Sequence, residues 1–346
     1  MNAFCQRLGI TLPVVLAPMG GEAACAPLVA AVSHVGGLGI LGAAYMTPAR
    51  IAEVIAQIRV LTDKPFGVNL FCPQPWQLDV ARTAAFVERL AGYHAELGLP
   101  PPQLPERFEE PFEAQFEVVR SARVAVFSFT FGDLGRARIL AMQAQGTQVW
   151  GTATQVREAQ QLAALGVDAV VAQGAEAGAH RGSFMGRRDE GLVGSMALVP
   201  QVVDALRIPV VAAGGIADAR GVRAAQALGA SAAAAGTAYL LADECPISAA
   251  YRAALQSTRD SDTVLTRAFS GRWARGLANR FTRELEAAEL PDFPIPNALT
   301  RPMRQAAGHA GRAEFLSLWA GQAVALAQAR PAARITQALA AGWQAA

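Results

Sequence analysis

Short apolar segments alternate along the first part of the chain with segments in which apolar residues recur at helical spacing. In eight of the short segments, apolar residues follow one another without a polar residue at every second position. A strand of this kind is buried on both faces, which is typical of a parallel sheet covered by helices. We expect strands at residues 14–19, 38–42, 66–71, 124–130, 147–153, 169–173, 210–213 and 232–235.

The segments between these strands carry helix signals. Thr47 and Pro48 provide an N-cap and a first helical residue. One apolar face then follows, formed by Ile51, Val54, Ile55 and Ile58. Further helices are expected at residues 24–35, 134–145, 155–165, 196–206 and 219–228, with Thr154 and Asp218 as N-caps and with Gly166 and Gly229 at the ends.

Eight strand–helix units in about 240 residues predict a TIM (β/α)8 barrel. The alternative is an open, doubly wound sheet, but no G-x-G-x-x-G motif follows the first strand. The barrel, residues 1–240, is interrupted at about residues 72–119 by seven prolines with charged helical pieces between them, and we expect an insertion there. Residues 241–310 predict a second, smaller C-terminal subdomain of helices and loops over the barrel mouth. Residues 311–346 predict C-terminal helices that pack on the barrel.

Composition and net charge indicate which kinds of binding partner to expect for this chain. Hydrophobic residues make up 52% of the chain and charged residues 17%, which indicates a large core. A net charge of +2 gives no reason to expect nucleic acid or an anionic membrane as a partner. The four cysteines lack C-x-x-C spacing, so we expect neither a disulfide framework nor a metal site.

The start of the chain does not have the pattern of a secretion signal, and no apolar segment has the ~18 residues of a membrane span. We therefore expect a cytoplasmic protein. The sequence leaves open whether the protein is a monomer or a homodimer.

Two glycine-containing loops are candidates for a phosphate site. Gly214–Gly215 and Gly236–Thr237 follow the seventh and eighth predicted strands. Ligands of TIM barrels bind at the C-terminal strand ends, and a phosphate is often held by the loops after these two strands. Glycine lets the backbone approach the phosphate oxygens, and Thr237 adds a hydroxyl donor. The alternative is that these glycines only form tight turns between strand and helix.

Two amide side chains, Asn69 and Gln173, stand at the ends of otherwise apolar strands. Because buried amides must be hydrogen-bonded, we expect a flat heterocycle such as an isoalloxazine beside them. An internal amide network is the alternative. The backbone of residues 17–19 is expected to lie against one side of such a ring.

His180 lies in a polar loop, Gly178-Ala179-His180-Arg181-Gly182, directly after the sixth predicted strand. A histidine titrates near neutral pH and can take a proton from a carbon acid. The alternative is that His180 only holds its loop in place. Arg181 is expected to pair with an anion or with Glu176. The loop of residues 270–276 is a candidate lid, in which Arg272 and Arg275 are expected to form structural ion pairs.

Together these motifs resemble the nitronate monooxygenases, formerly called 2-nitropropane dioxygenases. The matching segments are LAPMGG at 16–21, KPFGVNLF at 64–71, TAT at 152–154, QGAEAGAHRG at 173–182, AAGGIADARG at 212–221, GTAYLLADE at 236–244 and FSGRWARG at 269–276. They span most of the chain in the expected order, and as a set they are specific.

The resemblance implies a TIM barrel that binds FMN and oxidises alkyl nitronates or nitroalkanes with O2 to carbonyl compounds and nitrite. His180 would be the catalytic histidine, which either abstracts the α-proton of a neutral nitroalkane or orients an anionic nitronate. The cofactor-binding residues would be Ala17, Pro18, Met19, Asn69, Gln173, Gly178, Gly214, Gly215, Ala234, Ala235, Gly236 and Thr237. No metal is implied.

The chain departs from the family pattern at two places. Ala179 stands where a second glycine is expected, and a bacterial class of the family carries Tyr, Tyr and Lys where this chain has Phe293, Asn297 and Arg301. The wider superfamily includes FMN-dependent reductases, so an NAD(P)H:quinone or enoyl-thioester reductase remains an alternative. A non-catalytic flavin-binding barrel is a third.

Overall fold

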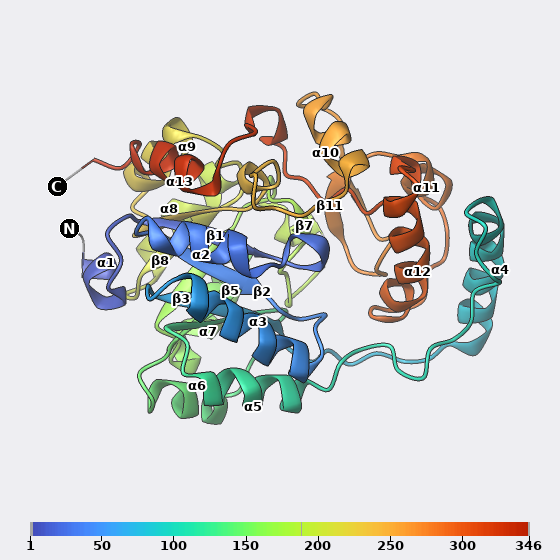
Figure 1. Ribbon diagram of the computed structural model, residues 1–346. Helices are drawn as coiled ribbons and strands as arrows, with labels where there is room; N and C mark the ends of the chain where they lie inside the picture. Colours follow the sequence, from blue (N-terminus) through green and yellow to red (C-terminus); the bar gives the residue numbers. More distant parts are fainter. Residues whose placement is uncertain (1–2, 188, 345–346) are drawn as a thin grey trace.

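Eight parallel strands close into a barrel in the computed structural model, which describes residues 3–187 and 189–344 (Figure 1). The strands are β1 (Val14–Met19), β2 (Leu38–Gly42), β3 (Phe66–Phe71), β4 (Val126–Thr130), β5 (Gln148–Ala153), β6 (Ala169–Gln173), β8 (Val210–Ala213) and β9 (Ala232–Ala235). β1 pairs with both β2 and β9, and the second pairing aligns Val14 with Ala233. The predicted TIM barrel is therefore confirmed.

The strand predictions agree closely with the structure. Six strands have the expected bounds, whereas β4 and β5 begin at Val126 and Gln148 instead of at residues 124 and 147. The residues that were expected to begin these two strands are joined by a side-chain hydrogen bond. The hydroxyl of Thr147 donates to the carbonyl of Val124 over 2.8 Å. A backbone bond from the Gln148 N–H to the Ala125 carbonyl lies beside it.

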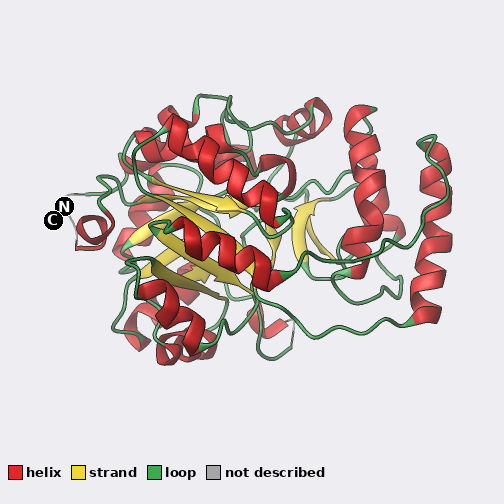
Figure 2. Cartoon of the chain, turned by 60° about the horizontal axis from the view of Figure 1, so that its bottom comes forward, coloured by secondary structure: helices red, strands yellow, loops and turns green. Residues whose placement is uncertain are grey.

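Helices surround the barrel on its outer face (Figure 2). They are α2 (Ala26–His34), α3 (Pro48–Leu61), α5 (Phe112–Ala122), α6 (Arg136–Gln143), α7 (Val156–Leu165), α8 (Ser195–Ala205) and α9 (Ala219–Ala227). Thr47 and Asp218 cap α3 and α9 as predicted, through bonds from the N–H groups of Arg50 and Arg220. The prediction that Thr154 caps α7 is wrong. The N-cap is Gln155, without a side-chain cap bond, because the Thr154 hydroxyl donates to Glu158 instead.

The segment between β3 and β4 first leaves the barrel and then returns to it. α4 (Val80–Glu96) packs against α12 (Ile295–His309) at the far end of the molecule, whereas α5 packs on α3 and β3 (Figure 1). The helix of the third barrel unit, α5, thus lies mostly within the residues that we expected to be an insertion, about 72–119. Arg280 joins α4 to the C-terminal part of the chain, because its Nη1 lies 2.6 Å from an oxygen of Glu96.

The chain after β9 extends over the C-terminal strand ends and then comes back. It contains α10 (Ala249–Gln256), β10 (Thr263–Thr266), β11 (Ala274–Leu277), α11 (Arg280–Glu284), α12 and α13 (Ala332–Ala340). β11 pairs with β10 on one side and with the short β7 (Ala179–His180) on the other. α13 packs against α2 and α9 of the barrel. Single turns of 3-10 helix lie at Gly21–Ala23, Asp189–Gly191, Thr237–Tyr239, Ala313–Phe315 and Val324–Leu326.

The opposite end of the barrel is closed by α1 (Ala3–Leu8). Phe4 packs on Trp150, with ring centroids 5.4 Å apart, and belongs to the apolar cluster that fills the barrel interior together with Val15 and Ile40. Figure 1 shows α1 at the end away from α12. Because this end of the barrel is filled, an open cavity can form only at the C-terminal strand ends. Among the described residues, no helix combines the length and the apolar character needed for a bilayer span.

Candidate functional site

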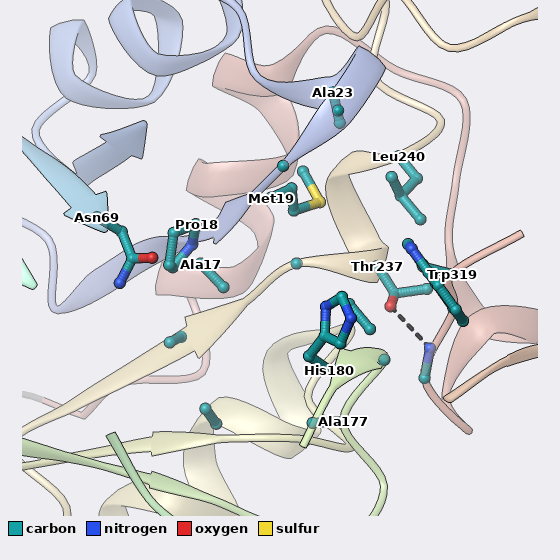
Figure 3. A pocket seen from close by; sticks show the side chains of 18 of the residues that line it. Ala17, Pro18, Met19, Ala23, Asn69, Ala177, His180, Thr237, Leu240 and Trp319 are labelled. Carbon is teal, nitrogen blue, oxygen red and sulfur yellow. Dashed lines mark hydrogen bonds between the residues drawn. The ribbon is translucent and has the colours of Figure 1, made fainter. Parts of the chain in front are cut away.

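A cavity of about 490 Å³ opens at the C-terminal ends of the barrel strands. Its volume lies within the roughly 300–1,000 Å³ of small-molecule sites. Every residue that the sequence predicts in the site lines it, and Figure 3 shows several of them around the cavity. They are Ala17, Pro18, Met19, Asn69, Gln173, Gly178, His180, Gly214, Gly215, Ala234, Ala235, Gly236 and Thr237. The structure thus brings the predicted residues together; their individual roles remain predictions.

Part of the cavity lining consists of alanine side chains, which we call the alanine floor. Ala17, Ala213 and Ala234 come from three strands that are neighbours in the barrel, β1, β8 and β9. Bulky branched side chains usually fill the interior of a TIM barrel. The alanines leave that space free, so a flat ligand can approach the strand ends closely.

The two glycine loops border the cavity beside this floor. Gly214 and Gly215 have φ values of 104° and 73°, a conformation that favours glycine. A Cβ atom on Gly214 would also lie 3.1 Å from the carbonyl oxygen of Gly174. Thr237 Oγ accepts a hydrogen bond from the N–H of Gly321, which fixes the second loop (Figure 3). Both loops therefore place glycine backbone at the border of the cavity.

The side-chain amides of Asn69 and Gln173 differ in their hydrogen-bond partners within the protein. Asn69 donates through Nδ2 to the hydroxyls of Ser128 and Thr130, and Figure 3 shows its oxygen on the side of Ala17 and Pro18. Gln173 uses both ends within the protein: Nε2 donates to the His180 carbonyl over 3.0 Å and Oε1 accepts from the Gly182 N–H. Gln173 therefore fits the internal-network alternative, although its side chain lines the cavity.

His180 is held by main-chain pairing and by four aromatic rings. β7 pairs with β11, and the N–H of Arg181 donates to the Trp273 carbonyl. The imidazole lies 5.7–6.0 Å, centroid to centroid, from the rings of Phe71, Phe131, Phe293 and Trp319. Ala179 has a φ of 59°, which is strained for alanine and explains why a glycine is expected there.

The environment of His180 favours its neutral form. Burial, with a smaller contribution from the positive charges of Arg272 and Arg304, lowers the pKa of the imidazole to about 3. This pKa lies below the value of about 6.5 in the unfolded chain. The contribution of His180 to the free energy of unfolding is therefore fully present above about pH 6.5, and it decreases as the pH falls toward 3.

We predict that His180 does not titrate between roughly pH 5 and 8. Long-range ¹H–¹⁵N correlation spectra of histidine-labelled protein at several pH values measure this, and the signal that disappears in His180→Asn identifies the residue. A midpoint for His180 inside this range would contradict the prediction.

The arginines near the site bind carbonyl groups, so the ion pairs expected of Arg272 and Arg275, and of Arg181 with Glu176, are wrong. Within the described part of the chain, Arg181, Arg272 and Arg275 form no salt bridge. Arg181 donates to the carbonyls of residues 173, 174 and 191. Arg272 donates to the Ser183 carbonyl and lies 3.8 Å above the Phe131 ring, and Arg275 donates to the Ala175 carbonyl.

The carboxylate of Glu176 binds Ser195 and not an arginine near the site. It accepts from the N–H and hydroxyl of Ser195, at the start of α8. Among the described residues, the charges of Arg272 and Arg304 are therefore not neutralised by direct contact with a carboxylate.

Glu158 is a residue of the site region that sequence reasoning missed. Its side chain is fully buried and accepts from the N–H groups of Thr154, Phe184 and Met185 and from the Thr154 hydroxyl. These bonds fix the loop after His180 on α7. A glutamate in the first turn of a helix usually faces solvent, so the sequence carried no signal for this role.

We predict that Glu158→Ala lowers the free energy of unfolding by about 3 kcal/mol or more, because one buried and two partly buried N–H groups lose their acceptor. Urea denaturation of the holoprotein measures the change. Glu53→Ala removes an exposed glutamate of α3 and should change stability by less than about 0.5 kcal/mol. Equal midpoints for the two variants would contradict the role of Glu158.

Other residues that sequence reasoning missed come from outside the barrel strands. Tyr45, Arg304 and Trp319 line the cavity, and burial raises the pKa of the Tyr45 hydroxyl to about 12, so that it stays neutral. Of the positions that depart from the family pattern, Asn297 and Arg301 line the cavity, and Phe293 packs on His180. Among the described residues, no cluster of His, Cys, Asp and Glu could hold a metal ion.

A closed parallel barrel with this cavity at its C-terminal strand ends defines a TIM-barrel protein with a small-molecule site. The family model described as nitronate monooxygenase matches residues 2–342. The chain therefore belongs to the nitronate monooxygenase family, and it is an enzyme of the oxidoreductase type.

Individual relatives agree with this assignment. A nitronate monooxygenase of Pseudomonas aeruginosa is 43% identical over 346 residues, which cover 98% of each chain. The solved nitroalkane oxidase of Streptomyces ansochromogenes is 39% identical, with a TM-score of 0.92 over 98% of this chain and 97% of its own. FabK of Thermotoga maritima is 29% identical, with a TM-score of 0.74 over 98% and 94% of the two chains.

Proposed function

We propose that this protein oxidises alkyl nitronates with O2 to carbonyl compounds and nitrite, with FMN as cofactor. The observation that carries the proposal is the convergence of His180, the two glycine loops and the alanine floor on one cavity. Membership of the nitronate monooxygenase family supports it. In the balanced reaction, two nitronates and one O2 give two carbonyl compounds and two nitrite ions.

The residues present fit a flat, phosphate-bearing cofactor. Gly214, Gly215, Gly236 and Thr237 would hold the phosphate through backbone N–H groups and a hydroxyl. Residues 17–19, Ala234, Ala235 and Gly178 would lie against the ring system, and Asn69 and Gln173 would border its polar edge. Bound FMN would accept electrons from the nitronate and pass them to O2, which is chemistry that protein side chains do not supply.

His180 and the nearby arginines would act on the substrate. A neutral imidazole can accept the α-proton of a nitroalkane. The charges of Arg272 and Arg304 disfavour the imidazolium, but they also favour the negative charge that develops on the nitro group. The four rings around His180 reduce its contact with water. The site would thus bind the anionic nitronate, whether it is supplied as such or formed there.

The test is an absorption spectrum of the purified protein, followed by a nitrite assay in air with a panel of nitronates. We expect a flavin spectrum and nitrite release that depends on both nitronate and O2. A protein that is colourless, and that does not take up FMN when it is added, would overturn the proposal.

A reductase is the second candidate, because FabK shares the fold over nearly the whole chain. In that case NAD(P)H would reduce the flavin, and a quinone or an enoyl thioester would accept the electrons. Anaerobic mixing separates the two functions. Rapid flavin bleaching by NADH supports the reductase, whereas bleaching by a nitronate alone supports nitronate oxidation.

A further inference from the structure

The imidazole of His180 makes its hydrogen bond with a side chain of the C-terminal part of the chain. Nε2 lies 2.9 Å from the hydroxyl oxygen of Ser270, which is buried. Within residues 3–187 and 189–344 this is the hydrogen bond that the ring makes, so Nδ1 is left without a protein partner. The side chain itself lines the cavity.

The hydroxyl of Ser270 has a hydrogen-bond acceptor other than the imidazole. Ser270 Oγ donates to the carbonyl of Arg272 over 3.0 Å and accepts from the Arg272 N–H at 3.2 Å. A carbonyl oxygen can only accept, so the single hydroxyl proton points to Arg272. With the hydroxyl proton directed at Arg272, the oxygen offers a lone pair to the imidazole, and the 2.9 Å contact then requires a proton on Nε2.

The turn that carries this hydroxyl is fixed from several sides. The N–H groups of Ser270 and Gly271 donate to the Arg267 carbonyl, and the Thr300 hydroxyl donates to the Phe269 carbonyl. Arg272 anchors the turn to the loop after His180, through the Ser183 carbonyl. The hydroxyl oxygen is thus held in one place relative to the imidazole.

We propose that Ser270 is a positioning residue that keeps His180 in the tautomer with a proton on Nε2 and a free lone pair on Nδ1. The inference rests on the proposed function, since it selects between two roles for His180. A lone pair accepts a proton and does not donate a hydrogen bond to an anion. His180 would then serve as the base that takes the α-proton of a neutral nitroalkane at Nδ1.

The first test measures the tautomer directly, without substrate. Long-range ¹H–¹⁵N spectra of the histidine-labelled holoenzyme distinguish a protonated from an unprotonated ring nitrogen, and His180→Asn identifies the signal. We expect an Nε2-protonated ring in the wild type, loss of this preference in Ser270→Ala, and its return in Ser270→Thr, which restores a hydroxyl. An Nδ1-protonated wild type, or an unchanged tautomer in Ser270→Ala, would overturn the proposal.

The second test separates proton abstraction from the later steps. Nitroethane is supplied either neutral or as its preformed nitronate. We expect Ser270→Ala to lower kcat/KM about tenfold for the neutral form, the equivalent of one hydrogen bond, and less than about twofold for the nitronate. Equal losses for the two forms would show a general loosening of the site and would overturn the proposal.

Thr300→Val is the matched control, because it removes a buried hydroxyl that holds the same turn but does not touch the imidazole. It should keep the wild-type tautomer and the wild-type ratio of the two rates. If the wild-type enzyme and all variants turn over neither nitroethane nor its nitronate, the proposed function is wrong. The tautomer measurement still decides the role of Ser270 in that case.

Discussion

His180→Asn is expected to lower turnover of neutral nitroalkanes by about a hundredfold to ten-thousandfold, the usual contribution of a general base. Asparagine keeps a polar side chain beside Ser270, but its amide has no basic ring nitrogen that could take the α-proton of the substrate. The imidazole is enclosed by aromatic rings, so solvent does not easily replace it. The rates of nitrite release with neutral nitroethane measure the loss.

The control for this variant is His309→Asn, the same change at an exposed position near the end of α12. It should retain wild-type turnover. Both variants should keep the flavin spectrum, because the proposed phosphate loops lie on other strands. Unchanged turnover in His180→Asn, with flavin retained, would remove His180 from the mechanism.

The barrel could be predicted from the sequence because its strands are buried on both faces. In all eight strands the expected end agrees with the structure, and only β4 and β5 begin later than expected. The location of the site followed from the fold, because parallel strands of a closed barrel bring all their C-terminal ends to one rim. Residues as distant in the sequence as Asn69 and Gly236 could thus be assigned to one cavity.

The remaining parts of the site depend on packing that no local pattern encodes. Trp319 belongs to the segment that was expected to pack on the barrel, yet its ring lies 5.7 Å from His180. Glu158 faces the core from a helix whose other features are those of a surface helix. The arginines near the site were expected to find carboxylates, but in the folded chain unpaired carbonyls of the loops are closer.

The other large effect is expected at Gly236. Its φ of −111° is accessible to any residue, and an added Cβ would meet Ala17 and Met19 at 3.5 Å and 3.7 Å, which are ordinary contacts. A valine there should therefore fold normally, but its methyl groups would occupy the space beside the alanine floor where the phosphate end of the cofactor is proposed to lie. We expect Gly236→Val to weaken FMN binding about a hundredfold, the equivalent of about 2.7 kcal/mol.

Titration of the apoprotein with FMN, followed by flavin fluorescence, measures this change. Gly236→Ala should give a smaller loss of affinity, because it adds only the Cβ that the structure accommodates. Gly92→Val makes the same substitution on the exposed side of α4, where nothing lies within 4 Å, and should bind FMN as the wild type does. If Gly236→Val binds FMN with wild-type affinity and unchanged stability, the loop after β9 does not hold the phosphate. The proposed orientation of the cofactor in the cavity would then have to be reversed.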